Sequence, residues 1–172
     1  MRIRATATVA VLAVFLVLLT GCGGGKKKDE GRTTTTRFPP TVPVTNIDLA
    51  EGSGICGYLT QSDVRTATGI ASQPGAGSRA ATNEACRWSL QGTNQFVLLL
   101  SNTGGASTFD RFREGATVED LPGVADRAFV VNDTAYALKG EKVLILQVAT
   151  TQPIPARKQA AINLMKMAAP RA

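Results

Sequence analysis

The strongest constraint on the fold is a period-two alternation in residues 86–91. Apolar side chains occupy every second position, Cys86, Trp88 and Leu90, and polar ones lie between them. This pattern is typical of a strand with one packed face and one solvent-exposed face. Residues 96–100 are apolar at every position, which predicts a central strand. A short turn separates the two segments, so an antiparallel hairpin is expected here.

Three more strands are predicted after this hairpin. They cover residues 127–131, 134–139 and 143–148. Asn132-Asp133 and Gly140-Glu141 separate them, and both pairs suit tight hairpin turns. Strands joined in this way form a meander.

Three helices are expected around the sheet. Thr60-Gln61-Ser62-Asp63 matches a capping box, so a short helix is predicted to begin there and end at Gly69. Residues 107–113 predict a second helix, with Phe109 and Phe112 both on its buried face.

A third helix is predicted to close the chain, starting near Pro155. Its buried stripe is expected at the helical spacing of Ala161, Leu164, Met165 and Ala168. Residues 72–83, rich in glycine, are predicted to form a loop. The fold class is therefore α+β, an antiparallel sheet of about five strands with a short N-terminal helix and a C-terminal helix packed on one face.

The N-terminus has the pattern of an export signal. Arg2 and Arg4 precede an apolar run over residues 9–19, which is too short for the roughly 20 residues of a membrane-spanning helix. Residues 19–22, Leu-Thr-Gly-Cys, resemble the lipobox of bacterial lipoproteins. The resemblance implies cleavage before Cys22 and attachment of diacylglycerol to its thiol. An ordinary secretion signal or an uncleaved anchor remains the alternative.

This interpretation divides the chain into three parts. Residues 1–21 are predicted to be a lipoprotein signal peptide, residues 22–53 a lipidated flexible tether rich in Gly, Lys, Thr and Pro, and residues 54–172 a single α+β domain. The expected location is the extracytoplasmic face of the cell membrane, where the lipid on Cys22 holds the protein. Lys26-Lys27-Lys28 would add attraction to anionic lipid, although a solvated charge run explains them equally well.

The chain has three cysteines, and lipidation of Cys22 leaves Cys56 and Cys86. Disulfides persist outside the cytoplasm, so we predict a bond between these two residues. Two buried thiols or a metal pair are the alternatives. A zinc site is disfavoured because the chain contains no histidine to complete the ligand set.

Charge and composition narrow the function without identifying it. The whole chain has a net charge of +6, but residues 54–172 hold 12 basic and nine acidic residues, a net charge of +3. This charge is mild and interleaved, so no nucleic-acid partner is expected. Without histidine, Ser-His and Cys-His catalysis is excluded. A Ser-Lys pair would need spatial information. We expect no cofactor and no metal.

Three carboxylates form the remaining candidate for catalysis. Glu119, Asp120 and Asp126 surround the turn at Pro122-Gly123. They could act as paired carboxylates or bind calcium, but their spacing matches no calcium loop and a solvated turn explains them better. Trp88 with Arg87 invites a binding-site interpretation, whereas Trp88 next to a disulfide is expected in the core.

Several motifs together resemble a family of small actinobacterial lipoproteins that carry a domain of unknown function. The family pattern is Cys-x-x-Leu-Thr, then Cys-x-Trp, then Gly-x-Gly-Asp, and it corresponds here to residues 56–60, 86–88 and 123–126. Ala125 stands where the family often has its second glycine. The resemblance implies an envelope location, a bond between Cys56 and Cys86, and a fold similar to the photosystem P-protein type. It implies no activity.

The favoured hypothesis is a monomeric, non-catalytic binding module of the cell envelope. Its ligand would be a lipid, a glycolipid or an envelope protein, bound on the sheet face that the last helix leaves open, where Arg87, Ser89 and Gln91 are expected. One alternative is an enzyme that acts on cell-wall material through the carboxylates. The other is a structural or sensor domain without a small ligand.

Overall fold

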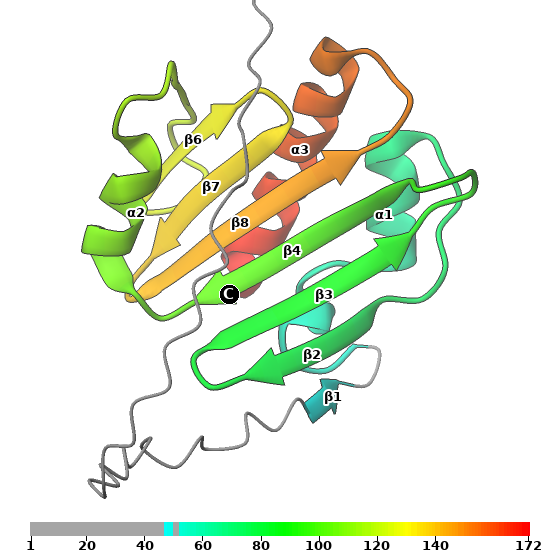
Figure 1. Cartoon of the computed structure of the whole chain (residues 1–172), viewed down its shortest axis with the longest axis horizontal. Helices are drawn as coiled ribbons and strands as arrows, with labels where there is room; N and C mark the ends of the chain where they lie inside the picture. The colour runs from blue at the N-terminus through cyan, green and yellow to red at the C-terminus, as the bar shows by residue number, and fades with distance from the viewer. Residues whose placement is uncertain (1–46, 50–51) are drawn as a thin grey trace, which may run out of the picture. The chain divides into compact units, whose positions relative to one another are not determined.

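The computed structural model describes residues 47–49 and 52–172, and its strands form one antiparallel sheet (Figure 1). The sheet has eight strands in the order β1-β2-β3-β4-β8-β7-β6-β5. Their bounds are β1 Ile47–Leu49, β2 Ala76–Ala80, β3 Asn83–Ser89, β4 Phe96–Asn102, β5 Glu119–Asp120, β6 Arg127–Val131, β7 Thr134–Lys139 and β8 Lys142–Ala149. The α+β class and the antiparallel sheet are confirmed.

The expected number of about five strands is wrong. The five predicted strands are β3, β4, β6, β7 and β8, and the sheet extends beyond them at both edges. Strands β1 and β5 have three and two residues, which is too short for an apolar alternation to be read. Strand β2 lies in the segment predicted as a loop, because Gly77 within it and Gly75 just before it resemble loop composition.

Strand β1 falls within residues 22–53, for which a tether is predicted. It pairs with β2 through Asp48 opposite Ser78 and Leu49 opposite Gly77. Ordered sheet therefore begins before residue 54. Residues 1–46, which include the signal segment and Cys22, lie outside the described residues.

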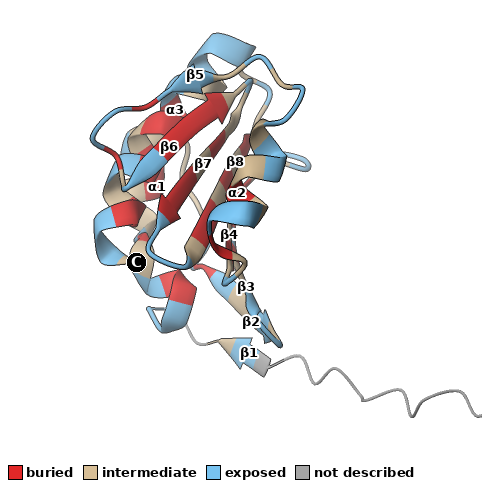
Figure 2. Ribbon diagram, turned by 90° about the vertical axis from the view of Figure 1, so that its left-hand side faces the viewer, coloured by how far each residue is buried: buried red, intermediate tan, exposed pale blue. Residues whose placement is uncertain are grey.

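Helices α1 (Gln61–Thr68) and α3 (Ile154–Ala168) cover one face of the sheet, as predicted for the two terminal helices (Figures 1 and 2). The capping box of α1 is present: Thr60 Oγ1 accepts from the Asp63 N–H at 3.1 Å, and Asp63 Oδ2 accepts from the Thr60 N–H at 2.9 Å. Gly69 ends the helix with a left-handed φ of 71°. Local sequence therefore sets both ends of α1.

The buried stripe predicted for the last helix is confirmed. Ala161, Leu164, Met165 and Ala168 are fully buried and belong to the main core. They pack against strands β7 and β8, whose side chains Ala137 and Leu146 are also fully buried in this core. A single-turn 3-10 helix, Ala169–Arg171, follows α3 and contains Pro170. On the same face, the 3-10 helix η1 (Gly54–Tyr58) packs against β3.

Helix α2 (Gly105–Arg113) lies on the opposite face of the sheet, where no helix was predicted (Figure 2). Its Phe109 is fully buried with Phe129, Leu138 and Val143 in a second, smaller core. The prediction that Phe112 is also buried is wrong, because 38% of it is exposed. The two faces of the sheet are therefore covered unequally.

Candidate functional site

The face of the sheet that carries α2 is only partly covered. In β4, Val97 and Leu99 point into the main core, so Phe96, Leu98 and Leu100 point to the opposite face. Leu100 lies between Ala85 of β3 and Ile145 of β8, and all of these open-face residues are only half-buried. We call this surface, made by the outward side chains of β3, β4 and β8, the open face.

Helix α2 stands at the β7 and β8 side of the open face. Its Phe109 meets Phe129 edge to face, with ring centres 5.0 Å apart, and Phe112 meets Tyr136 at 5.2 Å. Phe129 in turn stacks on Tyr136 at 4.8 Å. These contacts hold α2 over β7 and β8, with Phe109 reaching Phe129 of β6, so among the described residues the apolar side chains of β4 are left partly exposed.

A hollow of about 370 Å³ lies between α2 and strands β2, β3 and β4. Its floor is apolar, with Ala85, Leu100 and Ile145, and Phe112 of α2 forms one wall. The rim is polar: Asn102 donates a side-chain hydrogen bond to Asn83, and Ser78 and Thr108 complete it. Apolar pockets with a few polar groups are the usual form of small-molecule sites.

Arg87 gives the open face a positive charge. Its guanidinium lies 4.4 Å from the centre of the Phe96 ring, and the residue is exposed. None of the ion pairs among the described residues involves Arg87. On the same face, Arg127 is paired with Asp110. The guanidinium of Arg87 is therefore available to a ligand.

Sequence reasoning identified part of this site. Arg87 and Ser89 lie on the open face and Trp88 in the core, as expected, with Trp88 only 1% exposed. Asn83, Asn102 and Thr108 were missed. The alternation in β4 could have placed Asn102 on the same face as Leu98 and Leu100, but nothing local indicates that α2 folds beside it.

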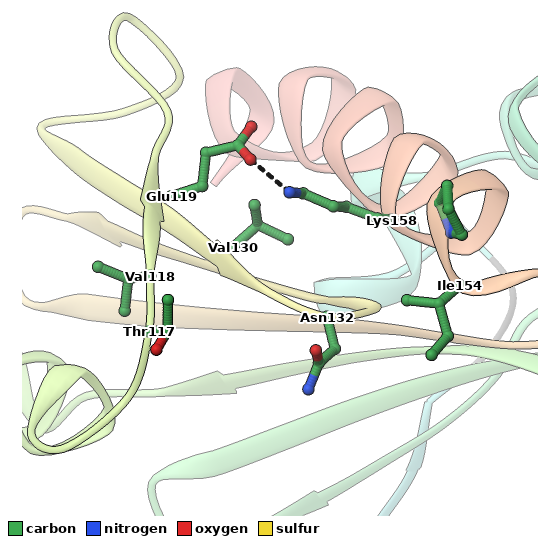
Figure 3. A pocket seen from close by; sticks show the side chains of 8 residues that line it. Thr117, Val118, Glu119, Val130, Asn132, Ile154 and Lys158 are labelled. Carbon is green, nitrogen blue, oxygen red and sulfur yellow. Dashed lines mark hydrogen bonds and ion pairs between the residues drawn. The ribbon is translucent and has the colours of Figure 1, made fainter.

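The three candidate carboxylates do not form one cluster. Glu119 pairs with Lys158 of α3 at a hollow of about 480 Å³ that Val130 and Ile154 also line (Figure 3). Asp120, the next residue in β5, points to the other face of the sheet and pairs with Arg113 of α2 at 2.7 Å. Alternation in a strand thus separates the two.

Asp120 and Asp126 both line a surface hollow of about 260 Å³ at the 121–128 turn. Each has its own partner there. The hydrogen bond from Arg113 holds the pKa of Asp120 below its ordinary value. Asp126 Oδ2 accepts from the Gly140 N–H at 2.7 Å, which ties the turn to the hairpin of β7 and β8. These contacts favour a structural role for both carboxylates.

The described residues contain no group of three or more His, Cys, Asp or Glu side chains placed to hold a metal ion. The sulfur atoms of Cys56 and Cys86 are 1.99 Å apart, at disulfide distance. Both residues are buried beside Trp88 in the main core. The pair joins η1 to β3.

No helix within residues 47–49 and 52–172 has the length and apolar character needed to cross a membrane. Comparison of the chain with protein-family models, with curated proteins and with solved structures gives no match in any of the three. The geometry of the open face is therefore the basis for a functional proposal.

Proposed function

We propose that this protein is a lipid-anchored, non-catalytic binding module on the extracytoplasmic face of the cell membrane, and that its open face binds an amphipathic, anionic lipid. The observation that carries the proposal is the partly exposed apolar surface of β4 beside the Arg87 guanidinium, which has no ion-pair partner among the described residues. The lipobox-like residues 19–22 and the resemblance to actinobacterial envelope lipoproteins support the location.

The apolar part of the open face suits an acyl chain. Phe96, Leu98 and Leu100 lie on alternate positions of β4, about 7 Å between successive side chains of one face. This row leads into the hollow of about 370 Å³ under α2. Burying half-exposed apolar side chains stabilises a complex by roughly 25 cal/mol for each Å² removed from water.

Arg87 suits the head group. It lies directly opposite Leu98 in the register of β3 and β4, so its charge is beside the row of apolar side chains. A guanidinium binds phosphate and carboxylate with paired hydrogen bonds. A ligand with one anionic group on a single apolar chain therefore matches this face, because its anionic group can pair with Arg87 while its chain lies along the apolar row of β4.

The test is a calorimetric titration of the full chain carrying Cys22→Ser. The titrant is lysophosphatidylglycerol, kept below its critical micelle concentration. Lysophosphatidylcholine with the same acyl chain is the comparison. We expect the anionic lipid to bind more tightly, and Arg87→Gln to weaken it by about tenfold and remove the preference. Leu98→Gln should weaken both lipids.

The matched control is Arg65→Gln, which removes one exposed guanidinium from α1 on the other face of the sheet. Equal weakening by Arg65→Gln would show a general charge effect and contradict the proposal. If neither lipid binds, and an envelope protein is captured by the parent chain but not by the Leu98→Gln variant, the open face is a protein-docking surface instead.

The location has a separate test. Cys22→Ser should release the protein from the membrane fraction to the soluble fraction, because the thiol that carries the lipid is removed. Cys56→Ser paired with Cys86→Ser is the control and should leave the protein membrane-bound. Membrane association of the Cys22→Ser variant after removal of residues 1–21 would contradict the lipid anchor.

A further inference from the structure

Another hollow, of about 420 Å³, lies on the other side of the sheet from the open face, where β3, β4 and β8 meet η1. The residues that line it are Gly54, Tyr58, Arg79, Ala81, Thr82, Glu84, Ser101, Thr103 and Lys142. Hydrogen-bond donors dominate this lining. We call it the polar hollow.

Ser101 is the most buried polar residue of the polar hollow. It lies opposite Glu84 in β3 and Leu144 in β8, on the face that carries the main core. Only 7% of the residue is exposed, and its hydroxyl makes no hydrogen bond to any residue in the described part of the chain but keeps some contact with solvent. A hydroxyl that no described residue engages can both donate to and accept from a molecule in the hollow.

Lys142 adds a cation without a carboxylate partner. Its Nζ donates to the Tyr58 hydroxyl at 3.0 Å and lies 5.6 Å from the centre of the Tyr58 ring. No ion pair among residues 47–49 and 52–172 includes it. An ammonium has three protons to donate, so two remain for a ligand. The Tyr58 hydroxyl accepts from Lys142 and keeps its own proton to donate.

Glu84 is the carboxylate among the described residues that line the polar hollow, and it is already paired. Glu84 Oε1 accepts from Arg79 Nε at 2.6 Å, and the two groups also form an ion pair. Their charges cancel, which leaves the positive charge of Lys142. Convergent donors around one uncompensated cation form a site for an anion with several acceptor oxygens.

The same residues place a serine and a lysine at one hollow, the arrangement that a Ser-Lys nucleophile would need. However, Lys142 donates to Tyr58, and no hydrogen bond joins it to Ser101. The geometry therefore supports binding of an anion by both groups.

We propose that the polar hollow binds a small oxyanion, a carboxylate or phosphate group, held by the Lys142 ammonium and the hydroxyls of Ser101 and Tyr58. The site is separate from the open face, because it lies on the opposite side of the sheet. It would recognise a small anionic metabolite or an anionic substituent on a larger envelope molecule.

The test is titration of the isotope-labelled full chain in nonionic detergent with inorganic phosphate and, separately, with acetate, monitored by amide chemical shifts. Sodium chloride at matched ionic strength is the reference. We expect saturable shifts at Ser101, Thr103 and Lys142 with at least one of the two anions. Ser101→Ala and Lys142→Gln should each weaken binding by about tenfold.

Lys139→Gln is the matched control. Lys139 lies directly opposite Lys142 across the hairpin of β7 and β8, is exposed, and does not line the polar hollow. It should leave the affinity unchanged. Equal weakening by Lys139→Gln, or shifts that do not exceed those produced by sodium chloride, would overturn the proposal. Preference for phosphate over acetate would identify which oxyanion the site takes.

Discussion

Gly77→Ala is expected to destabilise the protein through contact with the disulfide. A Cβ at position 77 would lie 2.6 Å from Cys56 Sγ, 2.9 Å from Leu49 Cβ and 3.3 Å from the Ala85 carbonyl oxygen. Ordinary contacts between such atoms are about 3.5–4.0 Å. The new methyl group therefore has about 1 Å too little room, against a cross-link and a backbone atom that move little.

The expected loss of stability is about 2–3 kcal/mol, in the upper part of the usual range for overpacked sites. For a domain of this size, that lowers the midpoint of thermal unfolding by roughly 8–15 °C. Urea unfolding followed by circular dichroism measures the free energy of unfolding. The control is Ser78→Ala, the adjacent residue of β2 on the opposite face, which should change stability by less than about 0.5 kcal/mol.

A double-mutant cycle attributes the effect to the sulfur atom. In a Cys56→Ala and Cys86→Ala background, the contact at 2.6 Å is gone, and only Leu49 on an edge strand and the Ala85 oxygen remain close. The cost of Gly77→Ala should fall to about 1 kcal/mol, a coupling of roughly 1–2 kcal/mol. An unchanged cost in that background would refute the steric explanation.

Three further outcomes are expected. Phe109→Ala should lower the free energy of unfolding by about 3–5 kcal/mol because Phe109 is fully buried against Phe129. Phe112→Ala, which removes a 38% exposed ring, should lower it clearly less. Urea unfolding compares the two variants, and equal losses of stability would contradict the second core. Thr60→Ala should cost about 1 kcal/mol by removing the capping hydroxyl of α1, and the same assay at pH 7 checks it. Burial raises the pKa of Asp63, but hydrogen bonds from Arg171 and Thr60 outweigh it and leave the pKa below its ordinary value of 3.8, so the stabilisation by Asp63 is present above that pH and is lost as the pH falls through the lowered pKa. Asp63→Asn should therefore destabilise the protein at pH 7, and its difference from the parent chain should shrink below about pH 4; a difference that is constant from pH 7 to pH 2 would contradict this linkage.

The elements that could be predicted from the sequence, such as β3 and α1, are those whose pattern of residues lies within the element or next to it. The alternation of Cys86, Trp88 and Leu90 indicates β3 because burial on one face imposes it. The capping box indicates α1 because it satisfies the first N–H groups of the helix. Each of these signals depends on neighbours within a few residues.

Strand β2 was missed because Gly77 within it and Gly75 just before it make contacts that are distant in sequence. A Cβ at Gly75 would lie 2.7 Å from Trp88 Nε1 and 2.8 Å from Cys86 Sγ, and one at Gly77 would meet Cys56 Sγ. The disulfide and the indole thus require glycine in this segment, and the same glycines give it the composition of a loop. Glycine within a strand often marks such close approach.

The sites were only partly predictable for a similar reason. Open-face positions follow from alternation in β3 and β4, so Arg87 could be placed there. The position of α2, and with it the hollow beside Phe112, depends on the contact of Phe109 with Phe129 of β6, a residue 20 positions away in the sequence. The polar hollow needs residues as distant as Tyr58 and Lys142, whose contact no local pattern indicates.

The order of the sheet also describes how the domain is assembled from two halves. Strands β1 to β4 pair in sequence, β5 to β8 pair in sequence, and the ladder from Phe96 opposite Ala149 to Asn102 opposite Val143 joins them. Hairpins within each half close short loops, whereas this ladder must close a long one, which makes it the slower step of folding.

The disulfide of Cys56 and Cys86 lies wholly in the first half, so it cannot hold the halves together. Leu100 with Ile145 in the hollow under α2, and Ser101 with Lys142 in the polar hollow, each place one residue on either side of the joining ladder. A molecule bound at either site would therefore contact both halves of the sheet. Its binding would raise the mechanical force needed to separate the two halves.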